Sequence, residues 1–453
     1  MAKFNRENVL RQLEFKRKWR SYSRYVYIAV PCVLCCLLCL YFAYSKFFVS
    51  EEQAVIRTTV GDFIYGDVVI GAYIDGEYSS TIPGKNDGYV VENVVCENGA
   101  AGEWNNDSWG LLTTNLSKRT KCNVYFKKLV TKVPDIIAQL DTSGKCPTVN
   151  DDGSVSVTGV EATNGYLCKA PDAYGDSYYY RGNVTNNYVL FADKYWRIVR
   201  INGDGTVRVI YDGTSAHANG ESSEDRQIGT SAFNNNYMDN AYVGYMYGQT
   251  GASTYAAAHA NTNNSTIKAY IDNWYKTNIV GTANEQYLAD NIFCNDRSIS
   301  SNKPDSYNNL GYGTNATAYR WYYGPWSSGG YNSNMRLTCP QKNDAFTVSD
   351  TTNGNGALTY PVGLLSTDEI VLAGGWNASN SGYYLYSGQY WWASSPSSFY
   401  GSIAYVRYVS SDGNANTNYY VVDINGVRPV FNLKAEVLAQ GSGTATDPYR
   451  ISS

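Results

Sequence analysis

A run of 21 residues, 25–45, contains no Lys, Arg, Asp or Glu and divides the chain into two different parts. As a helix rising about 1.5 Å per residue it would reach about 30 Å, the thickness of the hydrocarbon core of a bilayer. The first 24 residues carry a net charge of +6 and the whole chain carries −4, so the other 429 residues carry −10. Because positive charge marks the cytoplasmic side, the sequence predicts a cytoplasmic basic segment over residues 1–24 and a transmembrane helix over residues 25–48.

This arrangement predicts a single-pass protein of the cell membrane, with the N-terminus in the cytoplasm and the C-terminal region extracellular. A cleaved secretory signal is the alternative, because residues 43–45 offer a small-residue cleavage site. The long charged leader favours an uncleaved signal anchor, since the apolar cores of signal peptides usually span about 7 to 15 residues.

Tyrosine dominates the composition, with 43 of 453 residues, while only 17% of the residues are charged. Typical soluble domains contain roughly 25% charged residues. Tyr, Ser, Asn and Gly together are characteristic of recognition surfaces, because Tyr offers a large rigid contact area and a hydroxyl that tolerates water. The negative charge beyond the apolar run argues against nucleic acid as a partner.

Six cysteines follow the apolar run, and an even number in an exported region predicts three disulfides. Nearest-neighbour pairing would close three loops, each worth roughly 3 kcal/mol in the chain-entropy model. Beyond the apolar run there is no CxxC motif, and no histidine lies close in sequence to any of these six cysteines, so we expect no metal and no cofactor. The expected pairs are Cys96 with Cys122, Cys146 with Cys168, and Cys294 with Cys339.

The exported part reads as three regions. Alternating apolar and polar residues broken by Gly turns predict a β-sandwich-like stalk module over residues 58–130. Residues 131–180 read as a linker stapled by a disulfide, and residues 181–453 as the head. In the head, the turn "NGDG" at residues 202–205 lies between two alternating segments and predicts a β-hairpin.

Two helices are predicted in the head. Residues 267–278 repeat apolar positions with a 3.6-residue period, and Ser265 or Thr266 is available as the N-cap. Ser366 and Glu369 have the spacing of a capping box, with Gly374 as a plausible helix end.

The stretch "YWWASSPSSFY" at residues 390–400, followed by "GVRPVFNL" at residues 426–433 and preceded by "LLSTDEI", resembles a bacterial surface domain of unknown function. That domain is similar in pattern to the C-type-lectin-like fold, in the branch of formylglycine-generating enzymes and retroelement variable proteins. The resemblance implies an α+β fold: a single transmembrane helix, a small β-rich module, then a C-type-lectin-like domain of short twisted strands with two or more helices. It also implies that the solvent face of the C-terminal segment binds a ligand.

Neighbouring residues of an extended chain point to opposite faces, so one of Trp391 and Trp392 is expected inside and the other at the surface. Arg428 is expected to form a buried ion pair. Its candidate partners are Asp368, Glu369 and Asp423.

No catalytic constellation stands out, because His217 and His259 both lie in loop-like contexts without a nucleophile elbow. The sequence therefore predicts a non-enzymatic cell-surface protein that binds a glycan or a protein of a host or neighbouring cell. A carbohydrate-active or formylglycine-generating-like enzyme in the same head, or a purely structural envelope protein, are the alternatives. The expected ligand-binding residues are Trp391, Trp392, Phe399, Tyr400, Arg407, Tyr408, Asn414, Asn416, Asn418, Tyr419 and Tyr420.

Overall fold

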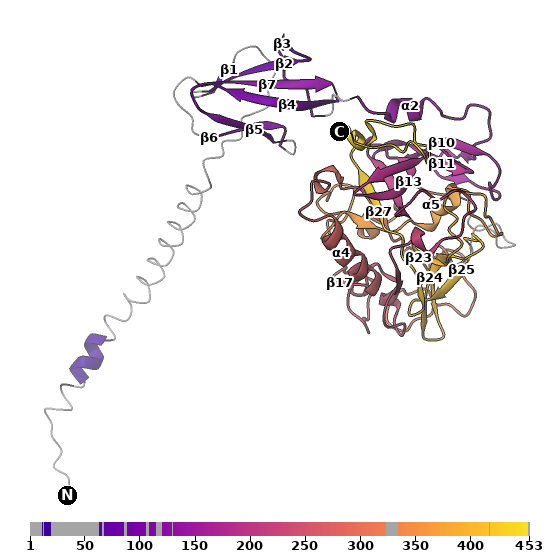
Figure 1. Cartoon of the computed structure of the whole chain (residues 1–453). Coiled ribbons are helices and arrows are strands. Elements are labelled where there is room, and N and C mark those ends of the chain that lie inside the picture. Colours follow the sequence, from indigo (N-terminus) through magenta and orange to yellow (C-terminus); the bar gives the residue numbers. More distant parts are fainter. Residues whose placement is uncertain are drawn as a thin grey trace, which may run out of the picture. The chain divides into compact units, whose positions relative to one another are not determined.

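The computed structural model describes residues 11, 13–19, 63–65, 68–85, 88–105, 108–114, 120–128, 130–322, 334–415 and 417–451. They belong to two compact units, Met1–Leu129 and Val130–Ser453, shown in Figure 1. Each unit has its own cluster of buried apolar side chains.

In the first unit, two β-sheets share a small core. The larger has the order β1-β2-β7-β4, with β3 on β2; β2 and β7 run parallel, and the smaller sheet pairs β5 with β6. Residues of β7 alternate between buried and half-buried, which places Cys122, Val124 and Phe126 in the core. The strands are β1 (Phe63–Tyr65), β2 (Val68–Ile74), β3 (Glu77–Ser79), β4 (Tyr89–Cys96), β5 (Ala101–Asn105), β6 (Gly110–Thr114) and β7 (Thr120–Lys128).

A seven-stranded sheet forms one layer of the second unit. Its order is β10-β11-β13-β14-β27-β22, with β12 on β13. The predicted hairpin is confirmed: β13 and β14 pair antiparallel across the turn at residues 202–205, where Gly205 has a φ of +82°. The strands are β10 (Gly165–Asp172), β11 (Gly175–Gly182), β12 (Tyr188–Phe191), β13 (Lys194–Ile201), β14 (Val207–Gly213), β22 (Val362–Gly363) and β27 (Val430–Leu433).

A second, six-stranded sheet carries the Trp-Trp motif. Its order is β15-β26-β23-β24-β25, with β19 on β23, and one apolar core joins it to the first sheet. Within the described residues, β25 pairs with β24 alone, so it is an edge strand. The strands are β15 (Thr230–Ala232), β19 (Thr317–Ala318), β23 (Trp391–Tyr400), β24 (Ile403–Val409), β25 (Thr417–Tyr420) and β26 (Ile424–Gly426).

Both predicted helices are present. In α4 (Thr266–Asn278) the Ser265 side chain caps the first turn, and α5 (Thr367–Leu372) begins with the expected capping box of Ser366 and Glu369. The remaining helices and strands are short: α2 (Val133–Ile137), α3 (Tyr255–Ala258), β8 (Thr148–Val149), β9 (Val155–Ser156), β16 (Met246–Tyr247), β17 (Asn263–Asn264), β18 (Phe293–Cys294), β20 (Asn334–Met335) and β21 (Ala345–Phe346).

The predicted α+β class is wrong, because the described part of the chain is mostly β with few helices. The two predicted helices occupy little of the second unit, and many short pairings between distant segments replace regular helical layers. Residues 131–180 are also more than a linker, because they include β10 and most of β11. Both strands belong to the large sheet of the second unit.

The expected transmembrane helix is not supported. Among the residues that the structure describes, no helix is both long enough and apolar enough to cross a bilayer, and residues 25–48 lie outside them. The single-pass localisation inferred from that helix is likewise not supported.

Candidate binding surface

Five tyrosines meet where β23, β24 and β25 run side by side. Tyr405 of β24 lies directly opposite Tyr420 of β25, and Tyr408 lies opposite Thr417. Because side chains alternate along a strand, Tyr408 and Tyr419 share one face of the sheet, while Tyr405 and Tyr420 share the other. Tyr390, immediately before β23, completes the group.

The five rings form a continuous chain of contacts, which we call the tyrosine chain. The centroids of Tyr390 and Tyr408 are 5.8 Å apart, and those of Tyr408 and Tyr419 are 5.4 Å apart. The rings of Tyr419 and Tyr420 lie nearly parallel at 6.0 Å, and Tyr420 meets Tyr405 edge-on at 5.1 Å. The chain of rings thus passes around the edge strand from one face of the sheet to the other.

Three of these rings are open to solvent. Tyr390 is 49% exposed, Tyr419 47% and Tyr420 43%, whereas Tyr408 is buried to 9% and Tyr405 is half-buried. Partial burial, and then a hydrogen bond with Tyr420, raise the pKa of Tyr405 above its ordinary value. The three exposed rings, each in contact with a neighbouring ring, present an aromatic surface to solvent.

Neither tryptophan of the motif belongs to this surface. Trp391 is 1% exposed and Trp392 is fully buried, so the expectation that one of them faces solvent is wrong. The Trp392 indole nitrogen donates to the Ser231 carbonyl at 2.9 Å, and its ring contacts Tyr408 from below. Both faces of β23 are covered, because its residues are buried at every position from Trp391 to Phe399.

Phe399 and Arg407 are also buried. Arg407 donates to the Trp321 and Tyr322 carbonyls, which holds the 321–322 segment against β24. Burial lowers the pKa of Arg407 to about 9. These two predicted ligand contacts therefore support the sheet and do not offer their side chains to solvent.

Tyr400, at the end of β23, is exposed but stands apart from the tyrosine chain. Its ring stacks on the buried Tyr307 with centroids 5.0 Å apart. Of the predicted asparagines, Asn418 is exposed on the edge strand and Asn414 is half-buried, whereas Asn416 lies outside the described residues.

Arg428 is fully buried but pairs with none of its three expected partners. Its guanidinium donates to Asp212 at 2.9 Å, and Arg226 reaches the same carboxylate oxygen at 2.7 Å. Arg197 lies 3.8 Å from the other oxygen. The expected partners belong to the segment at the start of α5 and to the residues just before Arg428, whereas Asp212 comes from β14, which the sheet brings alongside β27.

Sequence reasoning missed Tyr390, Tyr405 and this carboxylate. Tyr390 and Tyr405 both lie within the segment that the motif identified, but Tyr390 contributes through its contact with Tyr408 and Tyr405 through the β24–β25 register. The alternation of Tyr405 with the buried Val406 was a usable signal for an outward-facing ring.

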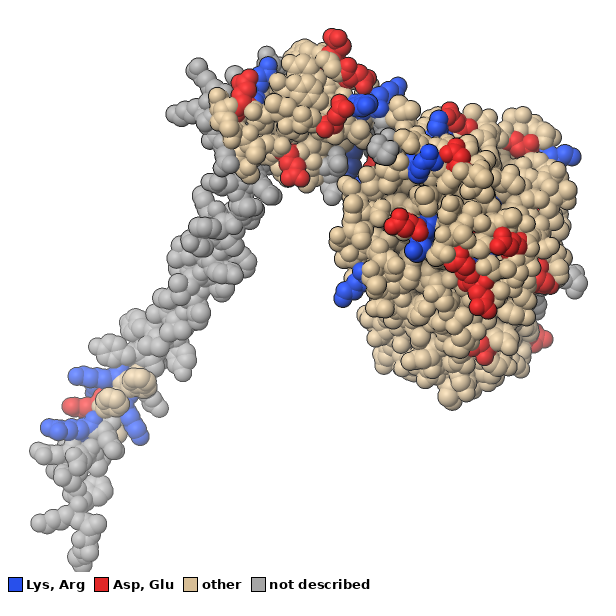
Figure 2. All heavy atoms as spheres, viewed as in Figure 1, with Lys and Arg blue, Asp and Glu red and all other residues tan. Residues whose placement is uncertain are grey.

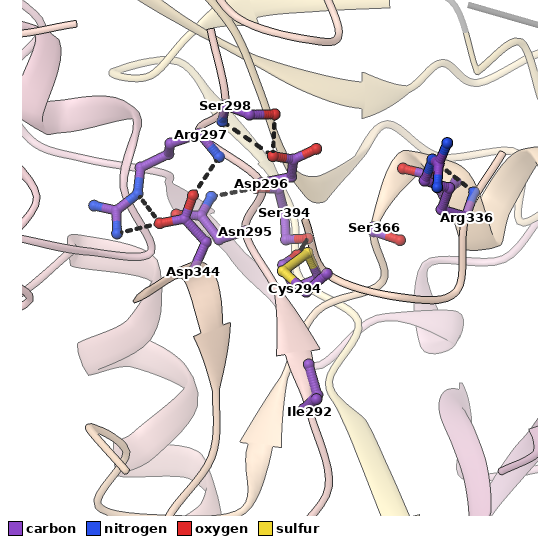
Figure 3. The surroundings of a disulfide bond; sticks show 12 residues. Ile292, Cys294, Asn295, Asp296, Arg297, Ser298, Arg336, Asp344, Ser366 and Ser394 are labelled. Carbon is purple, nitrogen blue, oxygen red and sulfur yellow. Dashed lines mark hydrogen bonds and ion pairs between the residues drawn. A yellow bond between two sulfur atoms is a disulfide. The ribbon is translucent and has the colours of Figure 1, made fainter. Parts of the chain in front are cut away.

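All three expected disulfides are confirmed: Cys96 with Cys122, Cys146 with Cys168, and Cys294 with Cys339. Figure 3 shows the third, where Ser394 donates to the Cys294 carbonyl and Asp344 pairs with Arg297 nearby. Every cysteine of the described residues is thus disulfide-bonded, which leaves no thiol pair there of the kind that a formylglycine-generating enzyme uses.

The two histidines are held by structural contacts. His217 places Nδ1 at 2.8 Å from Glu221 and Nε2 at 2.9 Å from Asp225. The hydrogen bond from His217 lowers the pKa of Glu221. Burial acts to raise the pKa of Asp225, but hydrogen bonds from His217 and Thr214 outweigh it and hold the pKa below its ordinary value. Neither ring nitrogen is available as a base without breaking one of these contacts.

His259 is buried, and its Nε2 lies 3.0 Å from the Gly311 carbonyl. Within the described part of the chain, no three or more His, Cys, Asp or Glu residues form a group that could hold a metal ion.

Residues 329–435 match a family model described as "Domain of unknown function (DUF6273)". The matched segment contains α5, the Trp-Trp motif, β23 to β27 and all of the tyrosine chain. The predicted resemblance to a domain of unknown function is thus confirmed in this coarse form. No curated protein and no solved structure matches the chain, so the C-type-lectin-like fold is not supported.

Proposed function

We propose that this chain is a non-enzymatic binding protein, and that the tyrosine chain at the β23–β25 edge is its recognition surface. The observation that carries the proposal is the continuous contact of five rings, three of them more than 40% exposed, at an edge strand of the sheet. Single exposed aromatic residues are common on proteins, but a contiguous exposed apolar patch is typical of an interaction site.

The chemistry of tyrosine suits recognition. Each ring offers flat apolar area with only two side-chain torsions to fix, and each hydroxyl donates or accepts hydrogen bonds at the rim. Contact with neighbouring rings restricts the exposed rings further, so a ligand loses less free energy in ordering them.

The scaffold beneath is built separately from the surface. Trp392 and Arg428 are buried and bonded to the backbone or to Asp212, while the rings of Tyr390, Tyr419 and Tyr420 lie outside them. Removal of the exposed rings should therefore leave the fold intact, because cavity formation is costly only for buried side chains.

The test is a triple substitution, Tyr390→Ala, Tyr419→Ala and Tyr420→Ala, in the full chain. Binding would be measured on panels of immobilised polysaccharides and of extracellular proteins, with the melting temperature recorded in parallel. Loss of central aromatic anchors typically costs about 2 kcal/mol or more each. We therefore expect the triple variant to lose its binding, with a melting temperature close to that of the wild type.

Tyr78→Ala combined with Tyr270→Ala is the matched control, because both residues are exposed and lie outside the tyrosine chain. The control should bind as the wild type does. If the triple variant retains full binding, or if its folding collapses, the tyrosine chain is not the recognition surface.

A further inference from the structure

Few charged residues lie in the segment that forms the tyrosine chain. Between residues 374 and 423, the only Lys, Arg, Asp or Glu residues are Arg407, Asp412 and Asp423. Arg407 is buried, so the segment presents no exposed positive charge of its own.

Asp412 is held by hydrogen bonds from its own turn and from Ser379. Its carboxylate accepts hydrogen bonds from Ser379 at 2.5 Å, from the Asn414 amide at 3.1 Å and from Ser410. These bonds lower the pKa of Asp412. The carboxylate is therefore committed to the turn that precedes β25.

Asp423 follows the last exposed ring. Its backbone amide donates to the Tyr420 carbonyl at 2.9 Å, which places the half-buried carboxylate one turn beyond that ring. Partial burial raises the pKa of Asp423 above its ordinary value. A carboxylate in this position is a strong acceptor for ligand hydroxyl groups and repels anions.

The segment that borders β24 is also nearly uncharged. The Ala404 amide donates to the Tyr237 carbonyl at 2.9 Å, so residues around Tyr237 lie beside the start of β24. Between residues 227 and 267, Asp239 is the only Lys, Arg, Asp or Glu residue in the sequence, and it is buried. On the face drawn in Figure 2, the lower part of the second unit shows hardly any Lys or Arg.

We propose that the ligand of the tyrosine chain is an uncharged glycan; this inference rests on the recognition surface proposed above. The exposed rings stack on the apolar faces of sugar rings, the Asn418 amide and the tyrosine hydroxyls bond to sugar hydroxyls, and Asp423 accepts a hydrogen bond from one of them. Each of these groups suits a polyhydroxylated ligand without charge.

Other classes of ligand fit less well. An anionic polysaccharide or nucleic acid needs exposed Lys or Arg, whereas Arg407 is buried and the solvent-accessible charges of the 374–423 segment are the carboxylates of Asp412 and Asp423. Protein interfaces are usually enriched in Arg and carry charge complementarity around the rim, and neither feature is present in the segments that border the rings.

The experiment is native affinity electrophoresis of the full chain in gels cast with uncharged polysaccharides (β-glucan, galactomannan or dextran) or anionic ones (polygalacturonate or hyaluronan). Tyr419→Ala/Tyr420→Ala and Asp423→Asn are run beside the wild type and the Tyr78→Ala control. We expect at least one uncharged polysaccharide to retard the wild type and the control. Affinity should fall by about tenfold or more in the double variant and should change little with added salt, because no ion pair is involved.

The outcomes separate this inference from the proposed function. Retention only by anionic polysaccharides, or binding only to a protein, overturns the uncharged glycan but leaves the recognition surface standing if the tyrosine variants lose it. Retention by no uncharged polysaccharide also overturns the inference. Binding that is unchanged in the tyrosine variants overturns both proposals.

Discussion

At the scale of single residues, burial decides the role of each polar side chain more than its identity does. Arg407 was expected to contact a ligand and Arg428 to form a buried ion pair, yet both are enclosed and donate to backbone carbonyls. Three guanidinium groups surround the single carboxylate of Asp212. Burying ions is costly unless such partners replace water, so Asp212 and its three arginines hold β14 and the neighbouring segments together.

His259 gives a pH-dependent stability. Burial, and secondarily the positive charge of Arg297, lower its pKa to about 2. The unfolded chain, with a histidine pKa of about 6.5, binds this proton more readily, so the folded state loses stability as the pH falls below about 6.5. Below that pH, one such group lowers the free energy of unfolding by about 1.4 kcal/mol per pH unit. Above about pH 6.5 the histidine is neutral in both states, so it no longer makes stability depend on pH.

The corresponding measurement is urea unfolding between pH 4 and pH 8 for the wild type and His259→Gln. Glutamine keeps a donor for the Gly311 carbonyl but takes up no proton. The free energy of unfolding of the variant should therefore fall less steeply with acid, and equal slopes for the two proteins would contradict the assignment.

At the scale of single elements, Glu369 of α5 both caps its own helix and forms ion pairs with the large sheet. Glu369 completes the capping box with Ser366, and the same carboxylate lies 2.5 Å from Arg208 and 3.3 Å from Arg200. Arg200 and Arg208 come from β13 and β14, so the helix start is joined to the large sheet by buried ion pairs.

Two substitutions separate these roles. Ser366→Ala removes only the cap and should lower the free energy of unfolding by about 1 kcal/mol. Glu369→Gln removes the carboxylate that pairs with the buried Arg208 and leaves Arg200 paired with Asp172, and it should cost about 3 to 5 kcal/mol. Urea unfolding at neutral pH measures both, with Asp176→Asn as a control, because the exposed Lys169–Asp176 pair should contribute about 1 kcal/mol or less. Equal effects of the two α5 variants would show that the ion pairs add nothing.

At the scale of the whole molecule, the two units have separate cores and separate disulfides. Cys96–Cys122 joins opposed residues of β4 and β7 in the first unit, and the other two disulfides lie in the second. The units are therefore expected to unfold as two cooperative transitions, because cooperativity follows a shared core.

Differential scanning calorimetry of the full chain tests this. Replacing Cys96 and Cys122 together by alanine removes a constraint worth roughly 3 kcal/mol. Only one of two transitions should move to lower temperature, whereas replacing Cys294 and Cys339 should move only the other. A single transition that shifts in both variants would mean that the units unfold together.

Local patterns in the chain were sufficient for several features. The β13–β14 hairpin, the caps at Ser265 and Ser366 and the three disulfides all follow from residues close together in the sequence. Turn chemistry and capping act over a few residues, and short loops favour closure between neighbouring cysteines. The sequence also located the segment that contains the tyrosine chain.

Long-range packing decided the rest. Whether Trp391 or Trp392 faces water depends on what covers β23, and the partner of Arg428 depends on β14 lying next to β27. The tyrosine chain likewise exists only because the β24–β25 register sets Tyr405 against Tyr420. Alternation along one strand specifies two faces but not their surroundings, because burial is a property of all the segments that pack together.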